Sequence, residues 1–204
     1  MKKVTYKLSN LFSLRKYGHN NMCSESYEYP MVATVRSAII SAIIRVDGVK
    51  KAEELFNKVK NEIIYIQYPE QFEKNVNRLH LVSNSAWRPA TKRGEDKVSV
   101  GQREFVDVDN ITFYIGNNIP FIDMYLKNID WIGTTESLVY LDNIEETNKL
   151  EDVLMTWDEK EDEFIYEMYD WDKKTKFENI YMYGDKYTKR KFSKTICYVT
   201  NKEI

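Results

Sequence analysis

Four segments of the chain carry the hydrophobic patterns of β-strands. Residues 4–8 and 111–115 alternate between hydrophobic side chains and more polar ones, a period typical of a strand with one buried face. Residues 63–68, which end before Pro69, are rich in β-branched and aromatic side chains, and 137–141 form a similar short run. These patterns predict four strands.

Three other segments have a helical spacing. Between Thr34 and Gly48, hydrophobic residues recur every three or four positions, and a second stripe of this kind covers 52–59. A short helix is predicted at 120–128. The most apolar run, 37–44, is far shorter than the ~20 residues that span a bilayer, so we expect a buried helix and no membrane association.

The order strand, helix, strand, strand, helix, strand is that of the ferredoxin-like fold. The sequence therefore predicts an α+β, ferredoxin-like (RRM-like) domain over residues 1–145. A polar insertion at about 71–102 separates its second and third strands, and long connections of this kind are usually functional or disordered. Residues 146–204 form a small β-rich extension, in which 164–168 and 177–182 are predicted to pair as a β-hairpin.

Composition excludes several classes of protein. The 204 residues are 43% hydrophobic and nearly balanced in charge, with 30 basic and 32 acidic side chains, which indicates an ordered globular chain. The two cysteines, Cys23 and Cys197, form neither a disulfide framework nor a C-x-x-C motif. The N-terminus lacks the apolar core of a signal peptide, so we expect a cytoplasmic protein.

Charge is distributed unevenly along the chain. Residues 142–172 contain thirteen carboxylates and two lysines, so this stretch should repel nucleic acid. It could exclude nucleic acid, meet a basic neighbouring subunit or form a plain solvated face. A basic cluster at 186–194 fits an ordinary solvated edge of the protein. Basic residues in the insertion and near the N-terminus are better candidates for a polyanion site.

The insertion and its flanks interleave cations with aromatic residues. Aromatic rings can stack on bases, and cations can track phosphates, so this pattern predicts an RNA-binding surface. The alternative is a solvated charged loop with its tryptophan packed into the core. The candidate residues are Arg78, His80, Trp87, Arg88, Lys92, Arg93, Lys97 and Arg103.

Two other segments carry candidate RNA ligands. Three of these residues follow the first predicted strand, where a loop could close over the same RNA or simply be solvated: Arg15, Lys16 and His19. Arg36 lies near the start of the central helix, where free N–H groups favour an anion. Its partner is either an RNA phosphate or the carboxylate of Glu25 or Glu28.

The sequence offers little support for cofactor chemistry. It has no P-loop, no H-E-x-x-H motif and no Rossmann glycine fingerprint. Asp170 and Asp172 match only the first half of a calcium-binding loop. We expect no metal and no cofactor.

Three short motifs stand out in order along the chain. They are Ser26-Tyr27-Glu28-Tyr29-Pro30, the helix start at 33–40 and the strand entry Ile132-Gly133-Thr134-Thr135-Glu136-Ser137. Together they resemble the CRISPR-associated protein 5 family of the RAMP superfamily, over about the first 145 residues. Ser37 stands where that family commonly has glycine, and the C-terminal third lacks the glycine-rich loop common to many RAMP proteins.

The resemblance implies a ferredoxin-like domain with an inserted β-hairpin thumb, which grips the 5′ handle of a CRISPR RNA. Members of the family stand at one end of Cascade, the type I interference complex of CRISPR antiviral defence. They contact the neighbouring backbone subunit and the large subunit that inspects target DNA, and in most systems they are structural. We therefore expect a cytoplasmic ribonucleoprotein subunit whose partners are CRISPR RNA, other Cascade subunits and, indirectly, target DNA.

Two alternatives to this structural role remain open. One branch of the family is a metal-independent endoribonuclease, and such cleavage needs a base and an acid at the scissile bond. That branch has an adjacent Lys-His pair with a distant tyrosine, whereas neither His19 nor His80 follows a lysine here. An unconventional set of Tyr27 or Tyr29 with Lys92 is still conceivable. The other alternative is a protein-interaction module with no RNA role.

Overall fold

The computed structural model describes residues 1–17, 23–82, 98–156, 165–180 and 192–204. Within them the helices are α1 (Val32–Asp47), α2 (Val49–Asn61), α3 (Ile122–Leu126) and the 3-10 helix η2 (Phe177–Asn179). The strands are β1 (Lys2–Leu8), β2 (Cys23–Ser24), β3 (Ile64–Gln67), β4 (Glu73–Val82), β5 (Val98–Asp107), β6 (Asn110–Ile115), β7 (Val139–Glu146), β8 (Lys149–Thr156), β9 (Tyr166–Trp171) and β10 (Phe192–Glu203).

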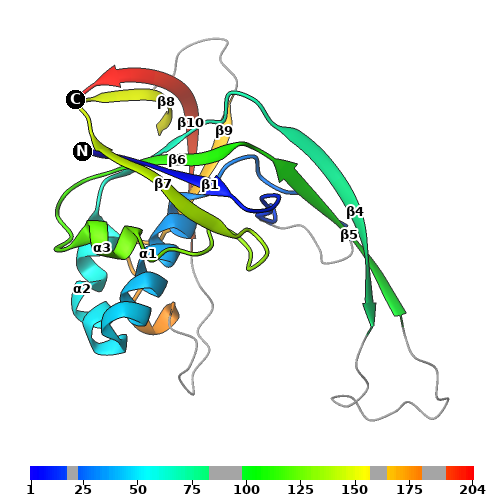
Figure 1. The fold of residues 1–204 in the computed structure, drawn as a ribbon, viewed down its shortest axis with the longest axis horizontal. Helices are drawn as coiled ribbons and strands as arrows, with labels where there is room; N and C mark the ends of the chain where they lie inside the picture. The colour runs from blue at the N-terminus through cyan, green and yellow to red at the C-terminus, as the bar shows by residue number, and fades with distance from the viewer. Residues whose placement is uncertain (18–22, 83–97, 157–164, 181–191) are drawn as a thin grey trace.

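Seven of these strands form one antiparallel sheet in the order β7-β1-β6-β3-β8-β10-β9. The α-helices lie together on one side of this sheet (Figure 1). The mixed helix and strand architecture predicted from the sequence is therefore confirmed. The spatial order β7-β1-β6-β3, with α1 between β1 and β3 and α3 between β6 and β7, is compatible with a ferredoxin-like domain.

The core lies between the sheet and the helices. Tyr6 and Phe113 are fully buried, and their rings stack with centroids 5.9 Å apart. The Tyr6 hydroxyl donates a 2.7 Å hydrogen bond to the Leu126 carbonyl at the end of α3. From α1, Ile39 and Ile43 are fully buried in the same cluster. Burial of each such side chain contributes about 1.5–3 kcal/mol, so the predicted alternation in β1 and spacing in α1 reflect one shared core.

Helix α1 ends where the sequence predicts. Gly48, directly after Asp47, has a φ of 85°, a conformation that favours glycine at a helix end. Among the helices that the structure describes, none combines the length and apolar character needed to cross a bilayer.

The described ends of the insertion belong to a long β-hairpin. β4 and β5 pair antiparallel from Glu73↔Asp107 to Val82↔Val98, and Figure 1 shows this hairpin extending away from the sheet and the helices. The short strand β2 runs parallel to β5, with Cys23 opposite Gln102. We call the β4–β5 hairpin the thumb, and residues 73–78 with 102–107 the thumb root.

The C-terminal region differs from its prediction. The expected hairpin between 164–168 and 177–182 does not form, because β9 pairs with β10 and the two strands join the main sheet. Phe177 and Ile180 are both buried and lie three residues apart, in and directly after η2. Their spacing fits a 3-10 helix better than a strand, which explains the wrong interpretation.

The described part of the acidic stretch is not only a solvated face. It contains β8, whose Leu150, Val153 and Leu154 are buried. β8 connects β3 to β10 in the sheet, so the sheet continues past the division predicted at residue 145.

Candidate nucleic-acid interface

The loop after β1 is fastened to the thumb root and to the turn at 132–137. Phe12 and Val106 exchange two backbone hydrogen bonds of 2.8 Å. The Thr134 N–H donates to the Ser13 carbonyl at 3.1 Å, and the Ser13 N–H donates to Ser137 Oγ at 2.9 Å. The third sequence motif therefore lies against this loop.

The first sequence motif is fixed at the same place. Ser26 Oγ accepts a 2.9 Å hydrogen bond from the Leu14 N–H, and the Tyr27 N–H donates to the Leu14 carbonyl at 2.9 Å. On its other side, the Ser26 N–H donates to Glu104 Oε1 of β5 at 3.1 Å. Segments that are more than 100 residues apart in the sequence thus meet at the thumb root.

Gly133 is required by the close approach of two of these segments. Its φ is +111°, and a Cβ there would lie 2.9 Å from the Ser13 carbonyl oxygen and 3.0 Å from Phe12 Cε2. Both the backbone conformation and the space therefore select glycine.

Replacing Gly133 with alanine is expected to destabilise the fold by about 1–3 kcal/mol, because strain and a backbone clash add. Denaturant unfolding measures this loss. Gly48→Ala is the matched control, since Gly48 also has positive φ but open space around its Cβ position. If Gly133→Ala is no more destabilising than Gly48→Ala, the turn at 132–137 does not pack closely against the loop after β1.

Cations at the thumb root are paired with carboxylates. Arg103 Nη1 lies 2.9 Å from Glu136 Oε2, and Lys74 Nζ bridges Glu28 and Glu104, 3.1 Å from the latter. A hydrogen bond from Thr134 and the charge of Arg103 lower the pKa of Glu136. Sequence reasoning did not single out Glu104, whose only signal was its place two residues after the insertion. These ion pairs join the thumb root to the first and third sequence motifs.

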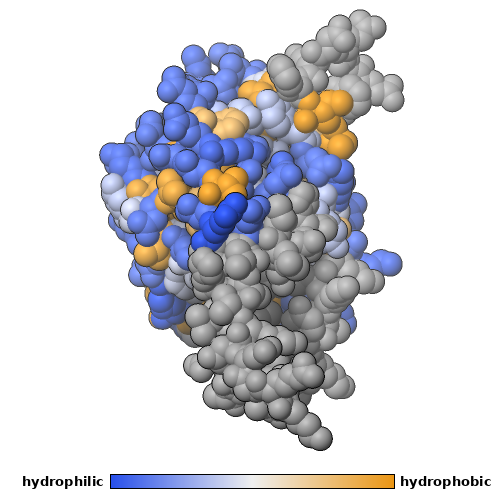
Figure 2. Space-filling model, turned by 90° about the vertical axis from the view of Figure 1, so that its right-hand side faces the viewer, coloured by the Kyte–Doolittle hydropathy of each residue, from blue (hydrophilic) through white to orange (hydrophobic). Residues whose placement is uncertain are grey.

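The two faces of the thumb root differ in charge. A groove of about 570 Å³ on one face is lined by Asn77 and Phe105 together with three carboxylates: Asp107, Asp109 and Glu136. Because side chains alternate along a strand, Lys74, Val76 and Arg78 lie on the opposite face together with Glu104. Arg103, which pairs with Glu136, lies on the groove face. Figure 2 shows that the surface on the thumb side of the molecule is mostly hydrophilic. The Arg78 face is the better candidate for a polyanion.

The structure places the predicted RNA ligands in three groups. Arg15, Lys16, Arg78 and Arg103 belong to the loop after β1 and the thumb root, and Lys16 Nζ lies 3.2 Å from Glu25 Oε2. Arg15 and Arg78 are exposed. The backbone of His80 pairs with Val100 farther along the thumb. Apart from Arg36, the remaining candidates lie outside the described residues: His19, Trp87, Arg88, Lys92, Arg93 and Lys97.

Arg36 is corrected from an RNA ligand to a structural residue. It is only 6% exposed, and its Nε and Nη2 donate to the two carboxylate oxygens of Asp170 at 2.9 and 3.0 Å. Nη1 donates to the Val59 carbonyl of α2. The guanidinium fork is thus occupied inside the protein, by a partner that was neither Glu25 nor Glu28.

The tyrosines of the first motif are buried as well. Tyr27 and Tyr29 are 6% and 3% exposed, and burial raises the pKa of both phenols far above its ordinary value. The Tyr29 hydroxyl donates to the Glu167 carbonyl at 3.0 Å. Phenols held in the protonated form are poor general bases.

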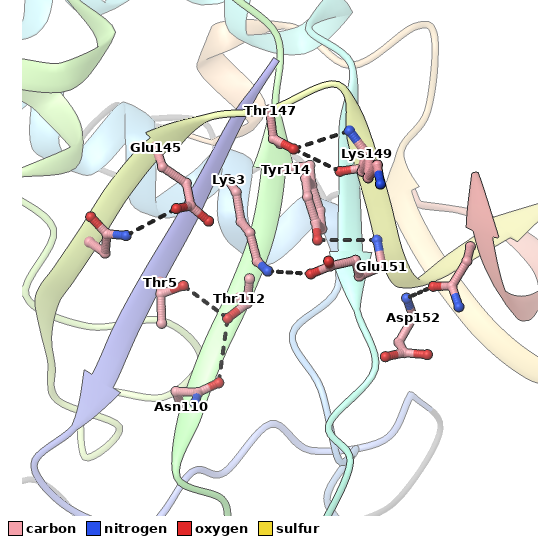
Figure 3. Close-up of polar contacts among 12 residues, drawn as sticks. Lys3, Thr5, Asn110, Thr112, Tyr114, Glu145, Thr147, Lys149, Glu151 and Asp152 are labelled. Atoms are coloured by element: carbon pink, nitrogen blue, oxygen red, sulfur yellow. Dashed lines mark hydrogen bonds and ion pairs between the residues drawn. The ribbon is translucent and has the colours of Figure 1, made fainter. Parts of the chain in front are cut away.

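On the sheet face that the helices leave uncovered, polar side chains of neighbouring strands contact each other (Figure 3). Lys3 Nζ donates to Glu151 at 2.6 Å, and the hydroxyls of Thr5 and Thr112 lie 3.2 Å apart. Tyr114 is fully buried beneath β8, where its hydroxyl accepts the Glu151 N–H at 3.1 Å. Its ring is therefore not available to stack on a base.

A curated relative supports the family resemblance that the three sequence motifs indicate. No protein-family model matches the chain. CRISPR-associated protein Cas5 from Archaeoglobus fulgidus is 26% identical over an alignment of 199 residues, which covers 90% of this chain and 85% of that protein. A crystal structure of a CRISPR protein from the same organism has a TM-score of 0.44 and 16% identity, over 76% of this chain and 67% of that one. The resemblance predicted from the motifs is confirmed by the curated relative, to which the chain is similar over most of its length.

Proposed function

We propose that this chain is a non-catalytic RNA-binding subunit of Cascade that holds the 5′ handle of CRISPR RNA. The observation that carries the proposal is the meeting of two family motifs and the loop after β1 at the root of a protruding hairpin. This arrangement occurs in a chain of which 90% aligns, at 26% identity, with CRISPR-associated protein Cas5 from Archaeoglobus fulgidus. In this proposal the strands β7-β1-β6-β3 and their helices are a ferredoxin-like (RRM-like) domain, and β4–β5 is its thumb.

The distribution of charge supports an RNA path along one face of the thumb. Arg78 lies on the face opposite the carboxylate-lined groove, and the sequence between β4 and β5 adds Arg88, Lys92, Arg93 and Lys97. Phosphate contacts from these cations would position the RNA, whereas stacking would hold unpaired bases. The carboxylate-lined face would keep the RNA to one side through repulsion.

The burial of the two tyrosines of the first motif supports a structural rather than a catalytic role for the chain. A metal-independent nuclease needs a group that accepts the proton of the 2′-hydroxyl. Tyr27 and Tyr29, the two tyrosines of the unconventional catalytic set, are buried and have raised pKa values. We therefore propose that the chain does not cleave RNA. Its proposed partners, by resemblance to the family, are CRISPR RNA, the backbone subunit and the large subunit.

Co-expression with the neighbouring genes and a repeat array tests this proposal. We expect the chain to be recovered in a large particle that carries RNA of one discrete length. Charge reversal of Arg88, Lys92 and Arg93 should reduce the bound RNA, whereas charge reversal of Lys50 and Lys58 on α2 should not. Recovery of a free monomer without RNA would refute the proposal.

Purified protein incubated with repeat RNA in chelator tests the enzymatic alternative. A structural subunit leaves the RNA intact over hours. A discrete cleavage product that persists in chelator would instead establish the endoribonuclease.

A further inference from the structure

A small pocket opens beside the N-terminal half of α1. It has a volume of about 250 Å³, below the ~300–1,000 Å³ of sites for drug-sized ligands. Its walls include the small residues Ala33, Ser37 and Ala38 of α1 and Gly133 of the third motif, together with the aromatic residues Trp131 and Phe192. The pocket thus combines small side chains, which leave space, with two aromatic rings that a planar group could contact.

The aromatic wall at Trp131 is held in position. The Arg45 guanidinium lies 5.5 Å from the centre of the Trp131 ring, in a cation–π arrangement. Arg45 also pairs with Asp130 and donates to the Asn128 carbonyl. Because these contacts fix the arginine, the ring loses little further freedom when a ligand binds.

An exposed aromatic residue continues the pocket outward. Tyr17 is 69% exposed, although its ring packs 5.5 Å from Tyr169 and 6.4 Å from Phe192. Its N–H donates to the Tyr27 hydroxyl at 3.4 Å. Phe192 thus belongs both to the pocket and to the ring cluster that supports Tyr17. A large exposed ring on a fixed backbone is the usual platform for an unpaired base.

Cations flank this aromatic surface. Arg15 and Lys16 precede Tyr17 directly, and Lys194 follows Phe192 by two residues on β10. Lys16 pairs with Glu25, and Lys194 pairs with Glu167. The hydrogen bond to Glu167 raises the pKa of Lys194. These three cations lie at or next to the segments that carry the ring cluster, within reach of the phosphate of a bound nucleotide.

We propose that the α1–Trp131–Phe192 pocket receives one unpaired RNA base, while Tyr17 stacks on a neighbouring base and Lys194 faces the phosphate between them. This inference rests on the proposed function and extends the RNA site from the thumb to the C-terminal strands β9 and β10. Sequence reasoning had assigned the 186–194 cluster to a solvated edge. The aromatic rings, the pocket size and the flanking cations all match single-stranded RNA.

Photo-crosslinking tests the site directly. Repeat RNA substituted with 4-thiouridine is bound to the full chain and irradiated, and crosslinked peptides are identified by mass spectrometry. We expect crosslinks to the peptides that contain Tyr17, Trp131 or Phe192. Crosslinks confined to thumb peptides would overturn the inference but leave the proposed function intact.

Affinity measurements on variants give a second, independent readout. Tyr17→Ala, and Ser37→Phe, which fills the pocket, should each weaken repeat-RNA binding by roughly 5- to 150-fold, the range for loss of one stacked base. Tyr17→Phe should retain most of the affinity. Tyr140→Ala is the control, because Tyr140 is also exposed but lies on β7, at the other edge of the sheet from β9.

The remaining outcomes are distinguishable. Wild-type chain that does not bind repeat RNA would overturn the proposed function, and this inference with it. RNA affinity unchanged in both Tyr17→Ala and Ser37→Phe would overturn the inference alone. The inference also fails if these variants lose a neighbouring subunit while still binding RNA, because a protein segment then fills the pocket.

Discussion

Shortening the thumb is expected to remove most of the affinity for repeat RNA while leaving the fold intact. In the variant, an Asn-Gly turn replaces residues 80–100 and joins Leu79 to Gly101, which face each other in the hairpin. Every pair of the thumb root from Glu73↔Asp107 onward is retained, including the hydrogen bonds that fasten the loop after β1.

The size of the effect follows from the charges removed. The replaced segment contains Arg88, Lys92, Arg93 and Lys97. If each neutralises one phosphate of single-stranded RNA, the slope of log K against log salt should become shallower by about 3. At 0.1 M salt this corresponds to a loss of roughly 100-fold or more. Titrations of labelled repeat RNA between 50 and 200 mM salt, the range over which such slopes are usually determined, measure both quantities.

A variant that loses four cations elsewhere separates this effect from a general loss of positive charge. Glutamine at four exposed lysines outside the thumb removes the same number of cations and should change the slope little: Lys50, Lys58, Lys127 and Lys174. A thumb-shortened protein with an unchanged salt slope would show that the thumb does not hold the RNA backbone.

The parts of the fold that the sequence predicted are those with a regular hydrophobic period. The strand at 4–8, the helix ending before Gly48 and the strand at 111–115 each place one face in a single core. β8 was missed because its period is broken. Asp152 has a φ of +48°, and the register between β8 and β10 shifts near it. As a result Leu150 and Val153, three residues apart, belong to the same buried cluster. An irregularity of this kind hides a strand from pattern reasoning.

The candidate site was predictable in its residue types but not in its contacts. Cations in the insertion and after β1 were identified, yet their partners come from distant segments, as with Arg103 and Glu136. Arg36 and Asp170 are 134 positions apart, and nothing in local spacing connects them. Likewise, Tyr17 and Phe192 meet only because β10 lies beside β9 in the sheet.

Removing the carboxylate of Asp170 is expected to be the most destabilising single change considered for this chain. Asp170→Ala leaves the Arg36 guanidinium buried without its bidentate partner, and this group cannot become neutral by losing a proton. Loss of one partner of a buried pair costs about 3 kcal/mol or more. For a chain of this size, each kcal/mol lowers the melting temperature by about 2–4 °C. Calorimetry should therefore show a decrease of roughly 6–12 °C.

Two further variants decide whether the pair is structural. Arg36→Met combined with Asp170→Leu should recover most of the lost stability, because an apolar pair of similar volume avoids the desolvation of both charges. Glu54→Ala, which breaks the exposed Lys51–Glu54 pair on α2, should cost less than about 1 kcal/mol. If the double variant is as stable as the wild type but binds repeat RNA much more weakly, Arg36 contributes to RNA binding after all. If its affinity is unchanged, the charge of Arg36 serves only to join α1 and α2 to β9.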